Sequence, residues 1–388
     1  MTWVKSDRLK ALPPYLFVEI DRAKREAIAA GRDVINLGVG DPDRPTFEFI
    51  IEAMRKVVGD PANHCYPFDE GVPRFRQAAA DFMLKRYGVE LDPTTEIITS
   101  IGSKDAIAHL PLAVVNPGEV VFVPRPGYPV YNSASVFAGA EPHYLNLTAG
   151  DGWLPDIEAI DAEAARNAKL IYVNYPNNPT AAGGDLCWYE KLIAWARDNE
   201  IIVASDAAYN EVYFETPPSS ILQVGGAKDV AVEFHSLSKT FNMTGWRIGW
   251  VAGNAEVIDA LAAVKGNVDS GQFNAVQWAG VAALDGFERE EIINQRRLYQ
   301  ARRDALCDGL AKLGYDVSPP AATFYVWCRC PDGADSMTFA KRCLSEADVV
   351  FIPGIGFGPT GEGYFRAALT VETERIDEAI ERMAKLSW

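Results

Sequence analysis

Residues 235–249 read HSLSKTFNMTGWRIG, with Lys239 between small hydroxyl residues and Arg247 a short distance beyond it. Burying a lone ammonium is costly, whereas a lysine amine bonded covalently to an aldehyde escapes that cost. The flanking hydroxyls and the arginine can together satisfy a phosphate dianion. The stretch therefore favours a lysine that carries an aldehyde phosphate such as pyridoxal phosphate. A surface loop with a solvated lysine has the same local pattern and is the alternative.

Short apolar runs typical of buried strands occur on both sides of this stretch, and helical segments separate them. The runs are 96–100, 119–124, 170–175, 201–206, 230–235 and 248–253. Apolar residues recur at helical spacing in 49–54 and 188–199. Strands that alternate with helices predict an α/β fold with a mostly parallel sheet covered by helices.

The C-terminal third changes character and predicts a second, smaller α+β domain. It has a charged helical pattern over 288–313, an aromatic strand at 324–327 and a final helix over 372–385. The predicted organisation is an N-terminal arm that forms part of the small domain (1–46), a large domain (47–287) and a small C-terminal domain (288–388).

Composition excludes several classes of function. The 388 residues are 48% hydrophobic, which is enough for a large core, and the net charge of -16 argues against a nucleic-acid or anionic membrane surface. The six cysteines are scattered without the spacing of a zinc or redox motif, so we predict no metal site and reduced thiols. No apolar stretch resembles a signal peptide or a membrane span. We expect a cytoplasmic protein.

Polar residues follow several of the predicted strands, and ligands of open α/β sheets gather at the carboxyl ends of strands. Asp206 ends an apolar run, where its carboxylate needs a cationic partner such as a protonated pyridine nitrogen; capping a helix over 207–211 is the alternative. Asn178 lies in a turn rich in Asn and Pro, which is also a common rigid turn. Gly102, Ser103 and Lys104 precede a helical run, where backbone N–H groups can bind phosphate.

With these motifs in order, nearly the whole chain resembles the class I/II aminotransferases, which are pyridoxal phosphate enzymes of fold type I. The motifs are Gly38-Val39-Gly40, Tyr66 with Gly71, Gly102-Ser103-Lys104, Pro126-Gly127-Tyr128, Asn178-Pro179, Asp206 with Tyr209, the stretch from Ser236 to Arg247, and Arg366. The resemblance implies transamination, with amino donor and 2-oxo acid acceptor using one site in turn.

The resemblance also implies roles for individual residues. Lys239 would bind the cofactor covalently and carry the proton, with Asp206 and Tyr209 as the other catalytic residues. The phosphate would be held by Ser103, Lys104, Ser236, Ser238 and Arg247, and by Tyr66 from the neighbouring subunit of a homodimer. Tyr128 would stack on the ring, Asp206 would pair with its nitrogen, and Asn178 and Tyr209 would bind its hydroxyl. Arg366 would bind the substrate α-carboxylate, with Gly40, Gly71 and Asn178 also at the substrate.

Within the family, the chain is most similar to the LL-diaminopimelate aminotransferases of lysine biosynthesis. In those enzymes the residues matching Tyr15 and Lys104 help to hold substrate, and an acidic residue matching Asp69 reaches the distal ammonium from the partner subunit. Here that position is the shorter aspartate, with Glu70 after it, and segment 269–271 lacks a matching asparagine. A solvated turn is the alternative for Asp69 and Glu70.

Three classes of function are therefore compared. The resemblance favours an aminotransferase for LL-diaminopimelate and a 2-oxo acid such as 2-oxoglutarate. An alanine, aromatic or broad-range aminotransferase is the nearest alternative. A lyase or decarboxylase on the same fold would share every cofactor residue. A ligand-sensing regulator would usually need a DNA-binding domain, for which the arm before Gly38 is short and the chain too acidic.

Overall fold

The computed structural model describes residues 4–12, 17–67, 70–331 and 334–388. Within these residues a seven-stranded sheet has the order β2-β8-β7-β6-β5-β3-β4. Every neighbouring pair is parallel except the two that include β8, which runs against both β2 and β7. The prediction of an α/β fold with a mostly parallel sheet is confirmed. The strands of this sheet are β2 (Ile97–Ser100), β3 (Val120–Arg125), β4 (Glu141–Asn146), β5 (Ala168–Asn174), β6 (Ile202–Asp206), β7 (Ala231–Ser236) and β8 (Gly249–Gly253).

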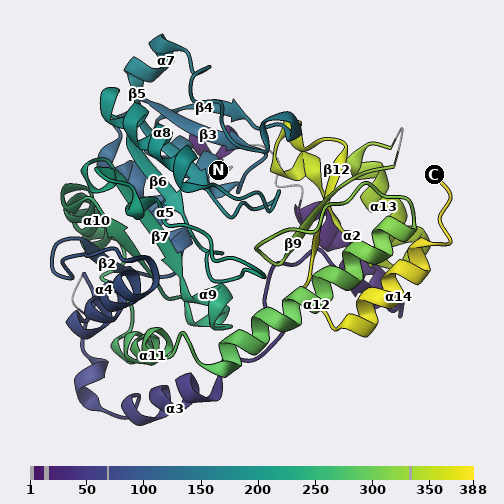
Figure 1. The fold of residues 1–388 in the computed structure, drawn as a ribbon, viewed down its shortest axis with the longest axis horizontal. Helices are drawn as coiled ribbons and strands as arrows, with labels where there is room; N and C mark the ends of the chain where they lie inside the picture. Colours follow the sequence, from purple (N-terminus) through teal and green to yellow (C-terminus); the bar gives the residue numbers. More distant parts are fainter. Residues whose placement is uncertain (1–3, 13–16, 68–69, 332–333) are drawn as a thin grey trace.

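Helices cover both faces of the sheet, as Figure 1 shows. Side chains alternate along β3, because Val121 and Val123 pack in one apolar cluster and Phe122 packs in another on the opposite face. The cluster of Phe122 includes residues of α4, α8 and α11, and the other includes residues of α5, α6 and α10. The helices are α4 (Pro73–Tyr87), α5 (Ser103–Val114), α6 (Val130–Ala138), α8 (Leu186–Asp198), α10 (Ala255–Val268) and α11 (Asn274–Asp285).

The C-terminal residues and part of the N-terminal residues form a second body with its own apolar cluster. Its antiparallel sheet has the order β11-β12-β9, and β1, near the N-terminus, pairs with β10 in parallel. In Figure 1 the long helix α12 leads from α11 into this body. Its elements are β1 (Ile35–Asn36), β9 (Tyr325–Arg329), β10 (Val349–Val350), β11 (Ile352–Pro353), β12 (Tyr364–Ala368), α2 (Phe17–Ala29), α12 (Glu290–Lys312), α13 (Ser336–Ala347) and α14 (Thr373–Met383). The exact domain boundaries stay a prediction.

Smaller elements connect these layers. They are α1 (Asp7–Lys10), α3 (Glu48–Val57), α7 (Ala162–Asn167), α9 (Leu237–Thr240) and short 3-10 turns that include η1 (Pro61–His64) and η5 (Thr244–Trp246). None of the helices in the described part of the chain is long and apolar enough to cross a membrane.

The carboxyl ends of β5, β6 and β7 lie at one edge of the large sheet, because these strands are parallel and in register. Asn174, the last residue of β5, pairs with Asp206, the last residue of β6. Helix α9, which contains Lys239, begins directly after β7. The sheet therefore brings Asp206 and Lys239 to the same edge from positions well separated in the sequence.

Candidate active site

A cavity of about 600 Å³ lies at this edge, between the large sheet and the second body. It is lined by twelve of the residues to which the sequence resemblance assigns a role: Gly40, Ser103, Lys104, Tyr128, Asn178, Asp206, Tyr209, Ser236, Ser238, Lys239, Arg247 and Arg366. The cavity thus gathers residues from the N-terminal segment, five strand ends or loops of the large sheet, and strand β12. Such a concave, partly apolar site with a few convergent polar groups is typical of a small-molecule site.

Lys239 projects from the short helix α9 into this cavity, where its Nζ donates a 2.8 Å hydrogen bond to the carbonyl of Gly40. Burial lowers the pKa of Lys239 to about 8; Asp41 opposes the shift, whereas Arg247 and Arg366 add to it. A neutral amine is therefore accessible close to neutral pH. Such an amine can attack an aldehyde and can accept a proton.

Asp206 is buried at the end of β6 and is held from two sides. Its Oδ2 accepts a 2.8 Å hydrogen bond from the hydroxyl of Tyr131, and its Oδ1 accepts a 3.3 Å bond from the backbone of Ala208. Burial raises the pKa of Asp206 to about 6, although these two hydrogen bonds lower it. Residues 208–211 form turns and no helix covers 207–211, so Asp206 is no helix cap. Its carboxylate can pair with a cationic N–H in the cavity.

Arg247 forms one wall of a polar recess beside Lys239. Its backbone is left-handed, with φ of 55°, and its guanidinium contacts the carbonyls of Thr244 at 2.9 Å and Ile101 at 3.3 Å and the Ser238 hydroxyl at 3.5 Å. Gly102 has a left-handed φ of 76°, and a Cβ there would lie 2.4 Å from Nη2 of Arg247, so glycine is favoured at this position.

Helix α5 supplies the opposite wall of this recess. It begins at Ser103, and the first N–H groups of a helix have no acceptor within the helix. We call the recess formed by Gly102, Ser103, Ser236, Ser238 and Arg247 the phosphate cup. An arginine, hydroxyl groups and a helix N-terminus together form the donor set that a phosphate requires.

Arg366 lies on β12 at the other side of the cavity and is almost fully buried. Its Nη1 donates a 2.7 Å hydrogen bond to the side-chain oxygen of Asn178, and its Nη2 donates a 2.9 Å bond to the carbonyl of Gly38. The guanidinium lies 4.0 Å from the ring centroid of Tyr325. A planar, fixed guanidinium of this kind suits a carboxylate.

The residues of the cavity fit pyridoxal phosphate. The phosphate cup offers donors to a dianion, the buried Asp206 has Oδ1 only weakly engaged, and the Lys239 amine lies in the same cavity. Tyr128, which also lines the cavity, could cover a flat ring, and Asn178 and Tyr209 offer polar groups near Asp206. Each part of an aromatic aldehyde phosphate thus has a chemically matched group.

Three residues with evident roles escaped the sequence reasoning. Tyr131 bonds Asp206, Asn174 donates to the Asp206 carbonyl at 2.7 Å, and the Tyr325 hydroxyl lies 3.1 Å from that of Tyr209. A signal existed for Tyr131, because it follows Tyr128 by one helical turn at the start of α6. A signal also existed for Asn174, since it ends the strand next to Asp206.

Four sequence-predicted residues do not line the cavity or cannot be placed. Tyr66 is 91% exposed, and Gly71 lies where a Cβ would be 2.0 Å from the hydroxyl oxygen of Thr99. Tyr15 and Asp69 lie outside the described residues. Their predicted roles stay predictions.

The fold and the lining of the cavity fit a pyridoxal phosphate enzyme, and the comparison with known families identifies its class as aminotransferase. The sequence pattern of the family described as aminotransferase class I and II matches residues 32–383, and the chain belongs to this family, whose enzymes use pyridoxal phosphate.

Individual relatives are similar over their whole length. LL-diaminopimelate aminotransferase from Syntrophobacter fumaroxidans is 52% identical over 389 residues, covering 100% of both chains. The enzyme of the same name from Aquifex aeolicus is 52% identical over 382 residues, covering 98% of each. Among solved structures, substrate-bound BacF from Bacillus subtilis has a TM-score of 0.94 at 36% identity, covering 99% of this chain and 98% of that one. This similarity confirms the fold type.

Proposed function

We propose that this aminotransferase transfers an amino group between LL-diaminopimelate and a 2-oxo acid such as 2-oxoglutarate, as a step of lysine biosynthesis. The observation that carries the proposal is the 52% identity, over 100% of both chains, to an enzyme named for this substrate. The six free cysteines fit the reducing cytoplasm, which we propose as its location.

The residues of the cavity support amino-group transfer. Bound pyridoxal phosphate supplies an electron sink next to the Cα of an amino acid. Burial lowers the pKa of Lys239 to about 8, so its amine can accept the proton from the substrate Cα. The same amine would then deliver that proton to the carbon of the cofactor's former aldehyde group. Asp206, fixed by Tyr131, would keep the ring nitrogen protonated, and the phosphate cup would prevent the ring from leaving during the two half-reactions. Tyr209, braced by Tyr325, would bind the ring hydroxyl.

Arg366 and Asn178 form the proposed site for the α-carboxylate of both substrates. The bond between them leaves Arg366 oriented before substrate arrives, and Nε of Arg366 is buried without a hydrogen-bond partner among the described residues. Gly40 must be glycine for steric reasons, since its Cβ would lie 1.8 Å from the Tyr325 hydroxyl oxygen. Gly40 therefore keeps the substrate side of the cavity open.

We place the distal end of the substrate near Lys104. This exposed side chain lies 5.9 Å from the ring centroid of Tyr128 at the cavity wall. Its ammonium could pair with the second carboxylate of LL-diaminopimelate. The second ammonium needs an anion, which we propose Asp69 of the partner subunit supplies, with the neutral Tyr15 hydroxyl contributing a hydrogen bond.

We also propose a homodimer with shared active sites. Tyr66 is 91% exposed, and Phe273, Trp278 and Val268 near α11 are also exposed apolar residues. The ring centroids of Phe273 and His64 are 6.4 Å apart, which connects the segment before Tyr66 to this face. A second copy that covers the face would bury these side chains, and Tyr66 would then reach the partner's phosphate.

A donor panel tests the proposed substrate. The wild-type enzyme is assayed for glutamate formation from 2-oxoglutarate with LL-diaminopimelate, alanine, aspartate and aromatic amino acids, and Lys239→Ala serves as the inactive control. We expect the highest kcat/KM with LL-diaminopimelate. A higher kcat/KM with alanine or an aromatic donor would mean that this donor, not LL-diaminopimelate, is the substrate. Release of ammonia or carbon dioxide would mean that the enzyme is a lyase or a decarboxylase.

A further inference from the structure

A fully buried lysine lies behind the phosphate cup. Lys265, on α10, has no exposed side-chain surface, and its Nζ lies 2.7 Å from Oδ2 of Asp105 and 2.9 Å from Oδ2 of Asp269. Lone buried ammonium groups are costly, so the two carboxylates that contact Lys265 offset the cost of burying its charge and form one ion-paired unit with it. This unit lies outside the residues that line the cavity.

Asp105 connects this unit to the wall of the phosphate cup formed by the start of α5. The Oδ2 atom that contacts Lys265 also accepts a 3.0 Å hydrogen bond from the backbone N–H of Ile101. Ile101 directly precedes Gly102, and its carbonyl accepts from Nη2 of Arg247 at 3.3 Å. The position of Asp105 therefore determines where the loop before α5 presents its N–H groups.

Asp269 connects the unit to the opposite wall of the phosphate cup, which Arg247 forms. Its Oδ1 accepts a 2.7 Å hydrogen bond from the backbone of Gly271, which orients the loop toward Gln272. The side-chain Nε2 of Gln272 then donates hydrogen bonds to the backbone carbonyls of Trp246 at 2.8 Å and Arg247 at 2.6 Å. Arg247 is left-handed, so its backbone depends on such external bonds to keep the guanidinium in the cup.

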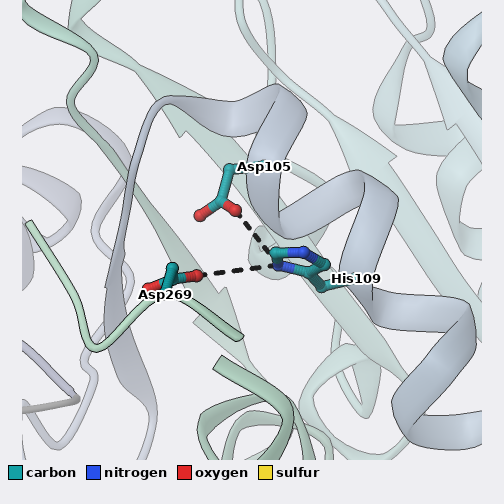
Figure 2. A group of neighbouring side chains, drawn as sticks. All are labelled: Asp105, His109 and Asp269. Carbon is teal, nitrogen blue, oxygen red and sulfur yellow. Dashed lines mark ion pairs between the residues drawn. The ribbon is translucent and has the colours of Figure 1, made fainter. Parts of the chain in front are cut away.

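The same group of side chains could be mistaken for a metal site. Figure 2 shows Asp105 and His109 on α5 facing Asp269, and the ligand atoms of these three residues lie within 4.8 Å of one another. His109 Nδ1 lies 3.0 Å from Oδ1 of Asp105 and 3.8 Å from Oδ2 of Asp269. The ammonium of Lys265, however, already contacts both carboxylates, so the cation of this cluster is a protein side chain.

We propose that Lys265 is a positioning residue for the cofactor phosphate: its ammonium joins Asp105 and Asp269, and thereby holds the two walls of the phosphate cup at a fixed separation. The inference rests on the proposed role of Arg247 and the α5 N-terminus as phosphate ligands. Lys265 itself touches neither cofactor nor substrate. Its effect should therefore fall on the phosphate alone and leave the aldehyde end of the site unchanged.

Comparing pyridoxal phosphate with pyridoxal tests this inference, because pyridoxal keeps the aldehyde and lacks the phosphate. The apoprotein of each variant is titrated with both compounds, and the dissociation constants are measured by absorbance. In Lys265→Met we expect about a tenfold or greater loss of affinity for pyridoxal phosphate with little change for pyridoxal. Asp269→Asn removes one charge at nearly constant shape and should cause a smaller loss of the same kind, which keeps the test open if Lys265→Met fails to fold.

Two reference variants separate the explanations. Arg302→Met removes another fully buried cation, paired with Asp43 and Glu372 in the second body, and should change the two affinities in the same proportion. Arg247→Gln should lose affinity for pyridoxal phosphate selectively, and failure to do so would reject the phosphate cup itself. If Arg247→Gln discriminates but Lys265→Met and Asp269→Asn weaken both aldehydes equally or neither, Lys265 has no positioning role.

Discussion

The hydroxyl of Tyr131 donates a 2.8 Å hydrogen bond to Oδ2 of Asp206, across a sequence separation of 75 residues. The Tyr131 ring is fully buried and stacks on Tyr172, with centroids 4.9 Å apart and an interplanar angle of 19°. The carboxylate that we assign to the ring nitrogen is therefore fixed by a rigid aromatic layer. Burial raises the pKa of Asp206, and the Tyr131 hydrogen bond is the largest of the interactions that oppose this shift.

Tyr131→Phe should raise the pKa of Asp206 further above the value of about 6 that burial already gives it, since the lost hydrogen bond favours the ionised form. The protonated carboxyl then persists to higher pH, where it no longer pairs with a ring N–H. We expect the acid limb of the kcat/KM profile to move upward in pH, with about a tenfold loss near pH 6. Steady-state kinetics from pH 5 to 9 measure the shift.

Tyr172→Phe is the matched control for that variant. Tyr172 is equally buried, and its hydroxyl donates a 2.9 Å hydrogen bond to the carbonyl of Ile107, away from the cavity. This variant should lose stability like Tyr131→Phe but keep the wild-type pH profile. Equal shifts in both variants would mean that the Tyr131 bond does not govern Asp206.

Asp206 should destabilise the cofactor-free protein at neutral pH. Its folded pKa of about 6 lies above the ordinary value of 3.8, so the folded state binds more protons than the unfolded state between these values. Stability from this group is present below pH 4 and is lost as pH rises to about 6. Asp206→Asn should therefore stabilise the apoprotein by up to about 3 kcal/mol at pH 7 and not at pH 4. Urea unfolding at both pH values measures this, and equal effects would contradict it.

Local sequence patterns predicted the residues that end strands or lie in short motifs. Asp206 ends β6 and Lys239 lies three residues after the end of β7, so the parallel strands bring them to one edge. Lys265 could not be assigned in this way, because it lies within a helix and its role appears only when a partner far along the chain is known. The spacing of Tyr131 from Tyr128 was a local signal, but it does not reveal the bond to Asp206. A helical lysine is ordinarily solvated, and nothing local indicates that Lys265 meets two carboxylates.

Arg366→Gln should weaken both half-reactions to a similar extent, because donor and acceptor present the same α-carboxylate to this guanidinium. The variant retains a hydrogen-bond donor, but it loses the positive charge and the two hydrogen bonds, to the Asn178 side chain and the Gly38 carbonyl, that orient the guanidinium. We expect kcat/KM to fall roughly 100-fold or more for each substrate. Arg382→Gln, in which a surface ion pair with Asp33 is lost, should leave both values near wild type. A loss confined to one substrate would place the carboxylate elsewhere.

A shared active site should be detectable by mixing two inactive variants. Lys239→Ala removes the amine of one subunit, and Tyr66→Ala removes the side chain proposed to reach the neighbour's phosphate. Hybrid dimers would contain one intact site and one doubly damaged site, so activity should return toward about one quarter of wild type if subunits mix randomly. No recovery after demonstrated subunit exchange, with Tyr66→Ala inactive alone, would reject the shared site.

Asp69 should determine selectivity for a substrate with a second ammonium. Asp69→Asn removes the charge at almost constant shape, so it should raise KM for LL-diaminopimelate roughly tenfold and spare alanine, whose side chain carries no amine. Because the α-carboxylate site at Arg366 is unchanged, kcat should change less than KM. Initial rates with both donors at saturating 2-oxoglutarate separate the two effects.

Glu70→Gln is the matched control for selectivity, because it removes the same charge one residue further along the chain. The backbone carbonyl of Glu70 accepts a 3.0 Å hydrogen bond from Thr99, and its side chain is exposed. If Asp69 supplies the anion, Glu70→Gln keeps the wild-type KM for LL-diaminopimelate. If Glu70→Gln raises KM for LL-diaminopimelate and Asp69→Asn does not, Glu70 binds the distal ammonium instead. Equal losses with LL-diaminopimelate and alanine in Asp69→Asn would mark Asp69 as structural, since a charge that recognises only the distal amine cannot affect alanine, which has no second amine.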